Sequence, residues 1–276
     1  MGDAVTDANG AMEQAPAGLA PSPEPFGMFR DVEKRFALGD GSHLKAIEKL
    51  SLTLEKGQLI SLLGPSGCGK TTFLRIVAGL ERASSGEVRI EGKSVSEPHP
   101  DFAFVFQQPN LMPWRTVLEN ILFPLEIRRE KTPQGVARAR ELVELVGLAG
   151  FEDRYPSELS GGMQQRVALC RALVHDAKLL LMDEPFGALD ELKRMEMHDL
   201  LLSIRARTGV TVLFVTHSIS EAIYLSDTVA VFSRRPATIR DLIQIALPYP
   251  RQSEQRYGAE FTRYEHEASR LLGIVR

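Results

Sequence analysis

The chain of 276 residues has few cysteines, little excess charge and no long apolar run. Two cysteines, Cys68 and Cys170, are too few for a disulfide framework and are typical of a reducing compartment. The 33 Lys and Arg residues nearly balance the 36 Asp and Glu residues, so no nucleic-acid partner is expected. No apolar run approaches the roughly 18 residues of a membrane-spanning helix. These absences predict a water-soluble protein of the cytosol.

The first 27 residues lack Lys and Arg and contain no apolar segment of the kind found in signal peptides. More than half of them are Ala, Pro or Gly, and such a segment cannot bury enough apolar surface to order itself. We therefore expect a disordered tail at 1–27 and a folded domain at 28–276.

From residue 28 onward, two kinds of hydrophobic pattern alternate. Alternating apolar and polar residues predict strands with one solvent-exposed face, as in an antiparallel sheet, at 28–36, 50–54 and 88–92. Denser apolar runs predict strands buried on both faces at 58–63, 102–106, 178–182, 210–216 and 228–232. Helical periodicity separates them at 70–78, 133–146, 161–174, 191–207 and 218–225. This order indicates an α/β fold with a mostly parallel sheet.

The segment from Gly64 to Thr71 reads GPSGCGKT, which fits G-x-x-x-x-G-K-[ST] between a predicted strand and a helix. Its glycines let successive backbone N–H groups point at phosphate oxygens, and the helix adds its positive end. Lys70 can reach the β- and γ-phosphates, and the Thr71 hydroxyl can ligate Mg²⁺. The segment predicts a nucleotide-binding site made by Gly64, Pro65, Ser66, Gly67, Cys68, Gly69, Lys70, Thr71 and Thr72.

Polar side chains end three further predicted strands: Asp183 with Glu184, His217, and Gln107. Ligands of open α/β sheets bind at the carboxyl ends of the strands, so these groups should lie beside the phosphate loop. Because consecutive strand residues point in opposite directions, we expect Asp183 to hold Mg²⁺ and Glu184 to orient or deprotonate the attacking water. His217 is expected at the γ-phosphate, and Gln107 at the metal or the water. The alternative is that these side chains have only structural roles.

Residues 159–165 read LSGGMQQ and open a predicted helix, with Ser160 as its N-cap. Alone, this segment is only a helix start. The motifs follow one another in the order phosphate loop, Gln107, this segment, Asp183 with Glu184, Asp190 and His217. With these motifs in this order, the chain resembles the ABC-transporter ATPases from residue 28 to the C-terminus. The resemblance implies a P-loop ATPase core with a mixed sheet, an antiparallel β subdomain, a helical subdomain at about 108–177 that carries the signature, and a C-terminal extension at about 234–276.

The resemblance also implies that ATP binds between two copies of the chain arranged head to tail. The phosphate loop of one copy would face the signature segment of the other, and Asp190 would lie at the seam. Phe36 would stack on adenine; the alternative is an ordinary edge-strand residue. The ATP-binding residues implied across the seam are Ser160, Gly161, Gly162, Gln164 and Asp190. By the same resemblance, Glu184 would be the catalytic base, His217 the γ-phosphate switch and Lys70 a phosphate contact. Gln107 would link the nucleotide state to a membrane partner.

The spacing of the motifs distinguishes between subgroups of the ABC proteins. The stretch between Gln107 and Ser160 is too short for the coiled-coil insert of DNA-repair relatives, and the single phosphate loop argues against the tandem type. Too few residues follow His217 for the extra regulatory domain of maltose- or sulfate-type importers. This chain resembles the nitrate/sulfonate/taurine importer group in the sequences of 104–120, 183–190 and 234–251. Many relatives, however, carry acidic residues where this chain has Gln108 and Ser218.

The family resemblance thus implies an ATP-hydrolysing importer subunit that binds ATP and Mg²⁺. It would act as a dimer on integral-membrane permease subunits at the cytoplasmic face of the inner membrane, and indirectly with an extracytoplasmic solute-binding protein. The solute would be a sulfonate, nitrate, taurine or a pyrimidine precursor. The alternative is a non-transport ABC ATPase that serves as a regulatory or structural module.

Two less common residues allow two interpretations each. Cys68 lies beside helix amides and Lys70, which favours a reactive thiolate shielded by nucleotide, but an inert residue that fills the loop fits equally well. Trp114 is the only tryptophan and follows the apolar residues 111–113. We expect it in the core, since aromatic residues usually help to bury small subdomains; the alternative is a groove that receives a helix of the permease.

Overall fold

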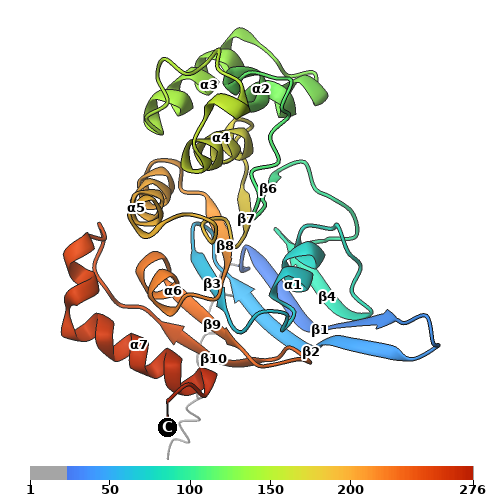
Figure 1. The fold of residues 1–276 in the computed structure, drawn as a ribbon. Coiled ribbons are helices and arrows are strands. Elements are labelled where there is room, and N and C mark those ends of the chain that lie inside the picture. Colours follow the sequence, from blue (N-terminus) through green and yellow to red (C-terminus); the bar gives the residue numbers. More distant parts are fainter. Residues whose placement is uncertain (1–23, 276) are drawn as a thin grey trace, which may run out of the picture.

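Two β-sheets form the centre of the structure, a computed structural model that describes residues 24–275 (Figure 1). The smaller, antiparallel sheet has the order β2-β1-β4-β5. Its strands are β1 (Gly27–Ala37), β2 (His43–Leu54), β4 (Ser85–Ile90) and β5 (Lys93–Ser94). The larger sheet has the order β10-β9-β3-β8-β7-β6 and is parallel except for β10, which runs antiparallel to β9. Its strands are β3 (Leu59–Leu63), β6 (Phe102–Val105), β7 (Leu179–Asp183), β8 (Thr211–Thr216), β9 (Thr228–Phe232) and β10 (Ile239–Gln244).

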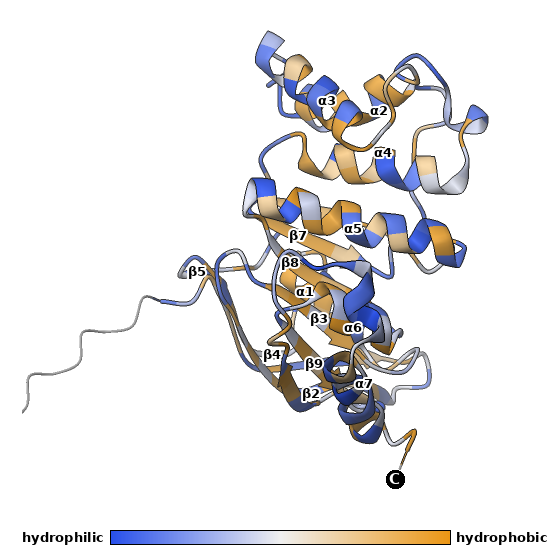
Figure 2. Cartoon of the chain, turned by 90° about the vertical axis from the view of Figure 1, so that its left-hand side faces the viewer, coloured by the Kyte–Doolittle hydropathy of each residue, from blue (hydrophilic) through white to orange (hydrophobic). Residues whose placement is uncertain are grey.

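Helices cover both faces of the larger sheet. Along β8, Val212 and Phe214 join one hydrophobic core while Leu213 and Val215 join the other, as the two-residue period of a strand requires. Figure 1 shows α1 (Lys70–Val77) on the side of the small sheet, and α5 (Glu191–Thr208), α6 (Ile219–Leu225) and α7 (Ala259–Leu272) on the other side. Strands buried on both faces are mostly apolar, which Figure 2 shows for β7 and β8.

Three helices between β6 and β7 lie together at one end of the molecule (Figure 1). They are α2 (Val117–Ile127), α3 (Pro133–Leu145) and α4 (Gly161–Leu173), with the short 3₁₀ helix η1 (Pro156–Glu158) before α4. Thr116 caps α2 through a capping box with Glu119, and Thr132 caps α3, so the sequence itself sets where both helices begin. Within residues 24–275, no helix is both long and apolar enough to cross a membrane.

The structure corrects several sequence-based expectations. The predicted tail ends too late, because Phe26 is 6% exposed and Gly27 already begins β1; residues 1–23 of that tail lie outside the described part of the chain. Helix α2 was not predicted, since it is apolar around most of its surface and contains Pro124, which together obscure a helical period. The amino half of β2, the strand β10 and the helix α7 were also not predicted.

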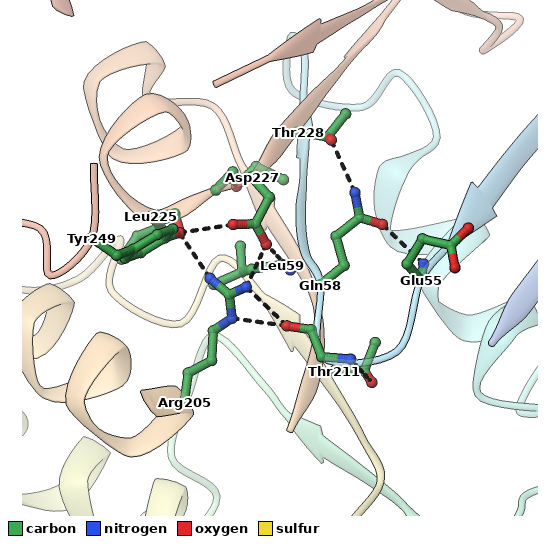
Figure 3. Close-up of polar contacts among 12 residues, drawn as sticks. Glu55, Gln58, Leu59, Arg205, Thr211, Leu225, Asp227, Thr228 and Tyr249 are labelled. Carbon is green, nitrogen blue, oxygen red and sulfur yellow. Dashed lines mark hydrogen bonds and ion pairs between the residues drawn. The ribbon is translucent and has the colours of Figure 1, made fainter. Parts of the chain in front are cut away.

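A cluster of polar contacts joins the amino ends of the central strands (Figure 3). Arg205, near the end of α5, donates through Nε and Nη2 to the Gly57 carbonyl, at 3.0 and 2.8 Å, and through Nη1 to the Tyr249 hydroxyl at 2.8 Å. Its Nη2 also donates to Asp227, whose other contacts are the Leu59 N–H and the Tyr249 hydroxyl. The segments before β3 and β9 are therefore held together at the edge opposite the phosphate loop.

Candidate functional site

The phosphate loop joins β3 to α1, as its sequence predicts. Gly69, the N-cap of α1, has φ 126°, and Gly67 has φ 71°, backbone conformations that side chains disfavour. At Gly64 a Cβ atom would lie 2.9 Å from Cβ of Phe232, so only glycine fits this close approach. Lys70 is 3% exposed, and its ammonium donates to the carbonyls of Gly64 at 2.7 Å and Pro65 at 3.0 Å. The loop thus surrounds its own cation.

Beside this loop lies a cavity of about 230 Å³. It is lined by Phe36, Leu44, Ala46, Ser66, Gly67, Gly69, Lys70, Thr71, Thr72, Glu184 and Arg235. The half-buried Phe36 ring, expected to face adenine, lies on the cavity wall and carries the Lys34 ammonium 4.8 Å from its centroid. An aromatic face next to glycine amides suits a planar base attached to phosphates.

Thr71 and Asp183 meet at the carboxyl end of β7. The Thr71 hydroxyl donates to Asp183 Oδ1 at 2.8 Å, which places two hard oxygen ligands side by side. Burial raises the pKa of the Asp183 carboxyl above its usual range, while the hydrogen bond from Thr71 opposes that shift. No cluster of three or more His, Cys, Asp or Glu side chains suited to a metal occurs in the described part of the chain. The two oxygen ligands of Thr71 and Asp183 fit Mg²⁺, which takes few protein ligands and completes its shell with phosphate and water.

Glu184 and His217 form the second pair at this edge. Glu184 has φ 45°, uncommon for a residue with a side chain, and its N–H donates to the carbonyl of Val215 on the next strand. Its Oε2 lies 2.9 Å from His217 Nδ1, and the imidazole is exposed. The left-handed backbone, in addition to strand alternation, gives Glu184 a direction different from that of Asp183. A carboxylate that contacts an imidazole here can bind and polarise a water molecule.

Gln107 follows β6 and is exposed, with its Nε2 3.8 Å from where a Cβ on Gly187 would lie. The side chain therefore lies against the loop that follows Glu184. The described residues show no hydrogen bond between Gln107 and Thr71 or Asp183.

The signature segment serves its own helix in this structure. The Ser160 hydroxyl accepts from the Met163 N–H at 3.3 Å and caps α4, and Gln164 Nε2 donates to the Pro156 and Leu159 carbonyls. Asp190 caps α5 and pairs with Lys193 at 2.7 Å, which lowers the pKa of its carboxyl. Among the described residues that line the cavity, none belongs to this group of expected ATP contacts: Ser160, Gly161, Gly162, Gln164 and Asp190.

The structure separates the two interpretations of Cys68 and of Trp114. Cys68 is 2% exposed, and its sulfur points toward Gly64, 3.3 Å from where a Cβ there would lie. This position fits a residue that fills the loop and does not fit an accessible thiolate. Trp114 is 73% exposed, so the expectation that it lies in the core is wrong.

Sequence reasoning missed three residues of the cavity wall: Leu44, Ala46 and Arg235. Arg235 donates through Nε and Nη2 to the Gly67 carbonyl, at 3.2 and 2.7 Å. It reaches the loop because the Ala237 N–H bonds the Ala46 carbonyl and so holds the segment after β9 against β2. The only signal for Arg235 in the sequence was the pair Arg234-Arg235 before Pro236. This pair did not indicate that Arg235 lies beside the phosphate loop.

Known proteins resemble this chain in sequence. The family described as ABC transporter matches residues 47–187. The aliphatic sulfonates import ATP-binding protein SsuB of Bacillus subtilis is 42% identical over 241 residues, covering 84% of this chain and 93% of that protein. The nitrate import ATP-binding protein NrtC of Synechococcus elongatus is 44% identical over 80% of this chain and 34% of its own length.

A solved structure agrees with these relatives. A dimeric ATP-binding cassette in a post-hydrolysis state, bound to ADP and Pi, is 30% identical to this chain. Its TM-score is 0.70, and the match covers 80% of this chain and 100% of that one. Relatives and fold thus lead to the conclusion that the phosphate loop and signature suggested: this chain belongs to the ABC transporter family, as one of its ATP-binding proteins.

Proposed function

We propose that the chain is the ATP-hydrolysing subunit of an ABC importer. One observation carries the proposal: the contact between Glu184 and His217 lies at the same sheet edge as the phosphate loop and the pair Thr71 and Asp183. A nucleotide that only binds needs no carboxylate and imidazole beside its terminal phosphate. A hydrolase does, because a water must be oriented and its proton accepted.

Each residue then has a distinct task. The Lys70 ammonium exchanges its two loop carbonyls for phosphate oxygens, and Phe36 and Arg235 bound the space for the remainder of the nucleotide. Thr71 and Asp183 would hold Mg²⁺, which would supply charge neutralisation for the phosphates. Glu184 takes the proton of the attacking water, and His217 fixes the Glu184 carboxylate and contacts the γ-phosphate. Gln107, against Gly187, responds to the position of the Glu184 loop.

A second copy of the chain supplies the contacts that one copy lacks. Ser160, Gly161, Gly162, Gln164 and Asp190 lie outside the cavity of their own chain, which is what a head-to-tail dimer requires. The two glycines at the start of α4 leave its first amides uncovered for an anion from the partner. The dimeric cassette bound to ADP and Pi is consistent with this arrangement.

A separate membrane permease completes the proposed importer. Trp114 is exposed on the loop before α2, in the helical region at about 108–177, and provides an apolar surface for a helix of the permease. The names of the relatives support a small anionic solute such as a sulfonate or nitrate, or a related solute such as taurine. The chain would act at the cytoplasmic face of the membrane, and an extracytoplasmic protein would deliver the solute.

Replacing Glu184 by Gln tests the shared active site. Glu184→Gln removes the base but keeps the size of the side chain, so ATP should bind without being hydrolysed and hold two chains together. Gel filtration in saturating Mg-ATP should show a dimer for this variant, and ATP turnover should fall by roughly a hundredfold or more. Glu144→Gln, an exposed change on α3, serves as the matched control and should behave as wild type.

A Glu184→Gln protein that stays monomeric in saturating Mg-ATP would contradict the shared site. The importer role is tested separately, by purifying the tagged full chain from membranes of its own host. Co-purification of a polytopic membrane protein supports transport. Recovery of the chain in the soluble fraction without such a partner supports the non-transport alternative.

A further inference from the structure

A buried polar cluster lies under the nucleotide edge but outside the nucleotide cavity. His198 of α5 is 2% exposed and Glu221 of α6 is 6% exposed. Arg256, in the short 3₁₀ helix η2 (Ser253–Tyr257) ahead of α7, completes the cluster. Arg256 is half-buried. Burying the Glu221 carboxylate is costly unless it is well paired, so the arrangement calls for a reason beyond packing.

Hydrogen bonds fix the protonation of His198. Arg256 Nη2 lies 2.8 Å from His198 Nδ1, and a guanidinium can only donate, so Nδ1 must accept. The proton of the neutral ring is therefore on Nε2, which donates to Glu221 Oε1 at 2.8 Å. Arg256 thus selects the tautomer that can hold Glu221, and the imidazole connects the two charged groups.

The other Glu221 oxygen reaches the backbone next to His217. Glu221 Oε2 accepts from the Thr216 hydroxyl, and Thr216 Oγ1 in turn accepts from the Ser218 N–H at 2.9 Å. The Ser218 hydroxyl accepts from the Glu221 N–H at 3.3 Å. Both chain neighbours of His217 are therefore bound to Glu221. The direction of the His217 side chain toward Glu184, 2.9 Å away, depends on these contacts.

We propose that Arg256, His198 and Glu221 are positioning residues for ATP hydrolysis, which act through Thr216 on His217. The proposal rests on the catalytic role of His217 given above. It means that the segment after β10 takes part in the reaction, although its residues do not line the nucleotide cavity. Loss of any member lets the segment 216–218 shift and moves the imidazole away from Glu184.

The surroundings of Arg256 keep it in place. Its guanidinium carbon lies 3.6 Å from the centroid of the Tyr224 ring, and the Tyr224 hydroxyl donates to Asp199 at 2.6 Å. Burial lowers the pKa of Arg256 relative to a free arginine, and the charge of nearby Asp199 opposes that shift. Without Arg256, either nitrogen of His198 can carry the proton, and Glu221 loses its assured donor.

The test compares two arginines of the C-terminal segment. Arg256 stacks on Tyr224, and Arg251 stacks on Tyr249 at 4.3 Å and donates to the Ser226 carbonyl, away from Thr216. Arg256→Ala should lower kcat for ATP by about 10- to 100-fold with KM nearly unchanged, because a misplaced catalytic group costs turnover and not binding. Arg251→Ala should lower thermal stability but leave kcat within about twofold. Arg256→Lys, which retains a donor, should recover part of kcat.

A double-mutant cycle separates positioning from general loosening of the structure. Thr216→Val breaks the step between Glu221 and His217, so Arg256→Ala should add no further loss of kcat in that background. Equal kcat for Arg256→Ala and Arg251→Ala, or additive losses in the cycle, would overturn the inference. If Arg256→Ala does not fold, His198→Phe, which removes the donor to Glu221, replaces it in the same cycle. Normal turnover of His217→Ala would instead refute the proposed catalytic role of His217.

Discussion

Asn120 organises the loop that carries Trp114, and its replacement by Asp is expected to be costly. The side chain is fully buried, accepts from the Met112 N–H at 2.8 Å and donates to three carbonyls. These belong to Met112 at 3.2 Å, Arg115 at 3.0 Å and Thr116 at 2.9 Å. Asn120→Asp keeps the shape of the side chain but replaces the donor with a carboxylate oxygen that faces those carbonyls.

The expected cost follows from the hydrogen bonds. The two N–H donors of the Asn120 amide, which the three carbonyls share, are both lost at about 1 kcal/mol each, so the free energy of unfolding should fall by about 2 kcal/mol before any charge effect. Burial among carbonyls raises the pKa of the introduced carboxyl above its value of about 3.9 in the unfolded chain. The folded state then binds the proton more tightly, so the penalty is smallest at low pH and grows as pH rises.

Urea unfolding followed by far-UV circular dichroism, at about pH 5 and about pH 8, measures both effects. Asn110→Asp, an exposed change in the same segment, is the control and should differ from wild type by less than about 0.5 kcal/mol at either pH. The reasoning is wrong if Asn120→Asp loses less than about 1 kcal/mol at the higher pH, or if its penalty shrinks as pH rises.

Two further predictions concern the residues that allowed two interpretations. Trp114→Ala should leave ATP turnover of the isolated subunit unchanged and weaken its binding to the permease. In the wild type, the fluorescence emission of Trp114 should shift to the blue when permease is added. An emission unaffected by permease would contradict this. Cys68 and Cys170 should both resist maleimide in the folded protein and react after unfolding in urea, because both are buried. Burial also raises the pKa of the Cys170 thiol. Rapid labelling of Cys68 in the folded protein, prevented by ATP, would instead support the reactive-thiol interpretation.

The parts of the fold that the sequence predicted best depend on short-range order. The phosphate loop lies between β3 and α1 because a buried apolar run, a glycine pattern and a helix start follow one another within a few residues. The pair Asp183 and Glu184 lies at the end of β7 for the same reason. Such features need no knowledge of which strands are neighbours.

The parts that could not be predicted depend on contacts between distant segments. Arg235 reaches Gly67 only because the chain after β9 pairs with β2, and no local pattern shows that pairing. The cluster of His198, Glu221 and Arg256 likewise forms from three elements. The prediction for Trp114 was wrong for another reason: it relied on the usual burial of aromatic residues, whereas the side chain is 73% exposed.

The contacts of Arg205 give the two edges of the main sheet unequal stiffness. At the amino edge, Gly57 and Asp227 cannot separate unless several hydrogen bonds of one guanidinium break together. At the carboxyl edge, the side chains face a cavity, and separate pairs such as Glu184 and His217 join the loops. Amide hydrogen exchange, which reports local opening of the structure, should therefore be fastest at the carboxyl edge. We therefore expect the sheet to open least at the edge away from the cavity, where one guanidinium joins several segments.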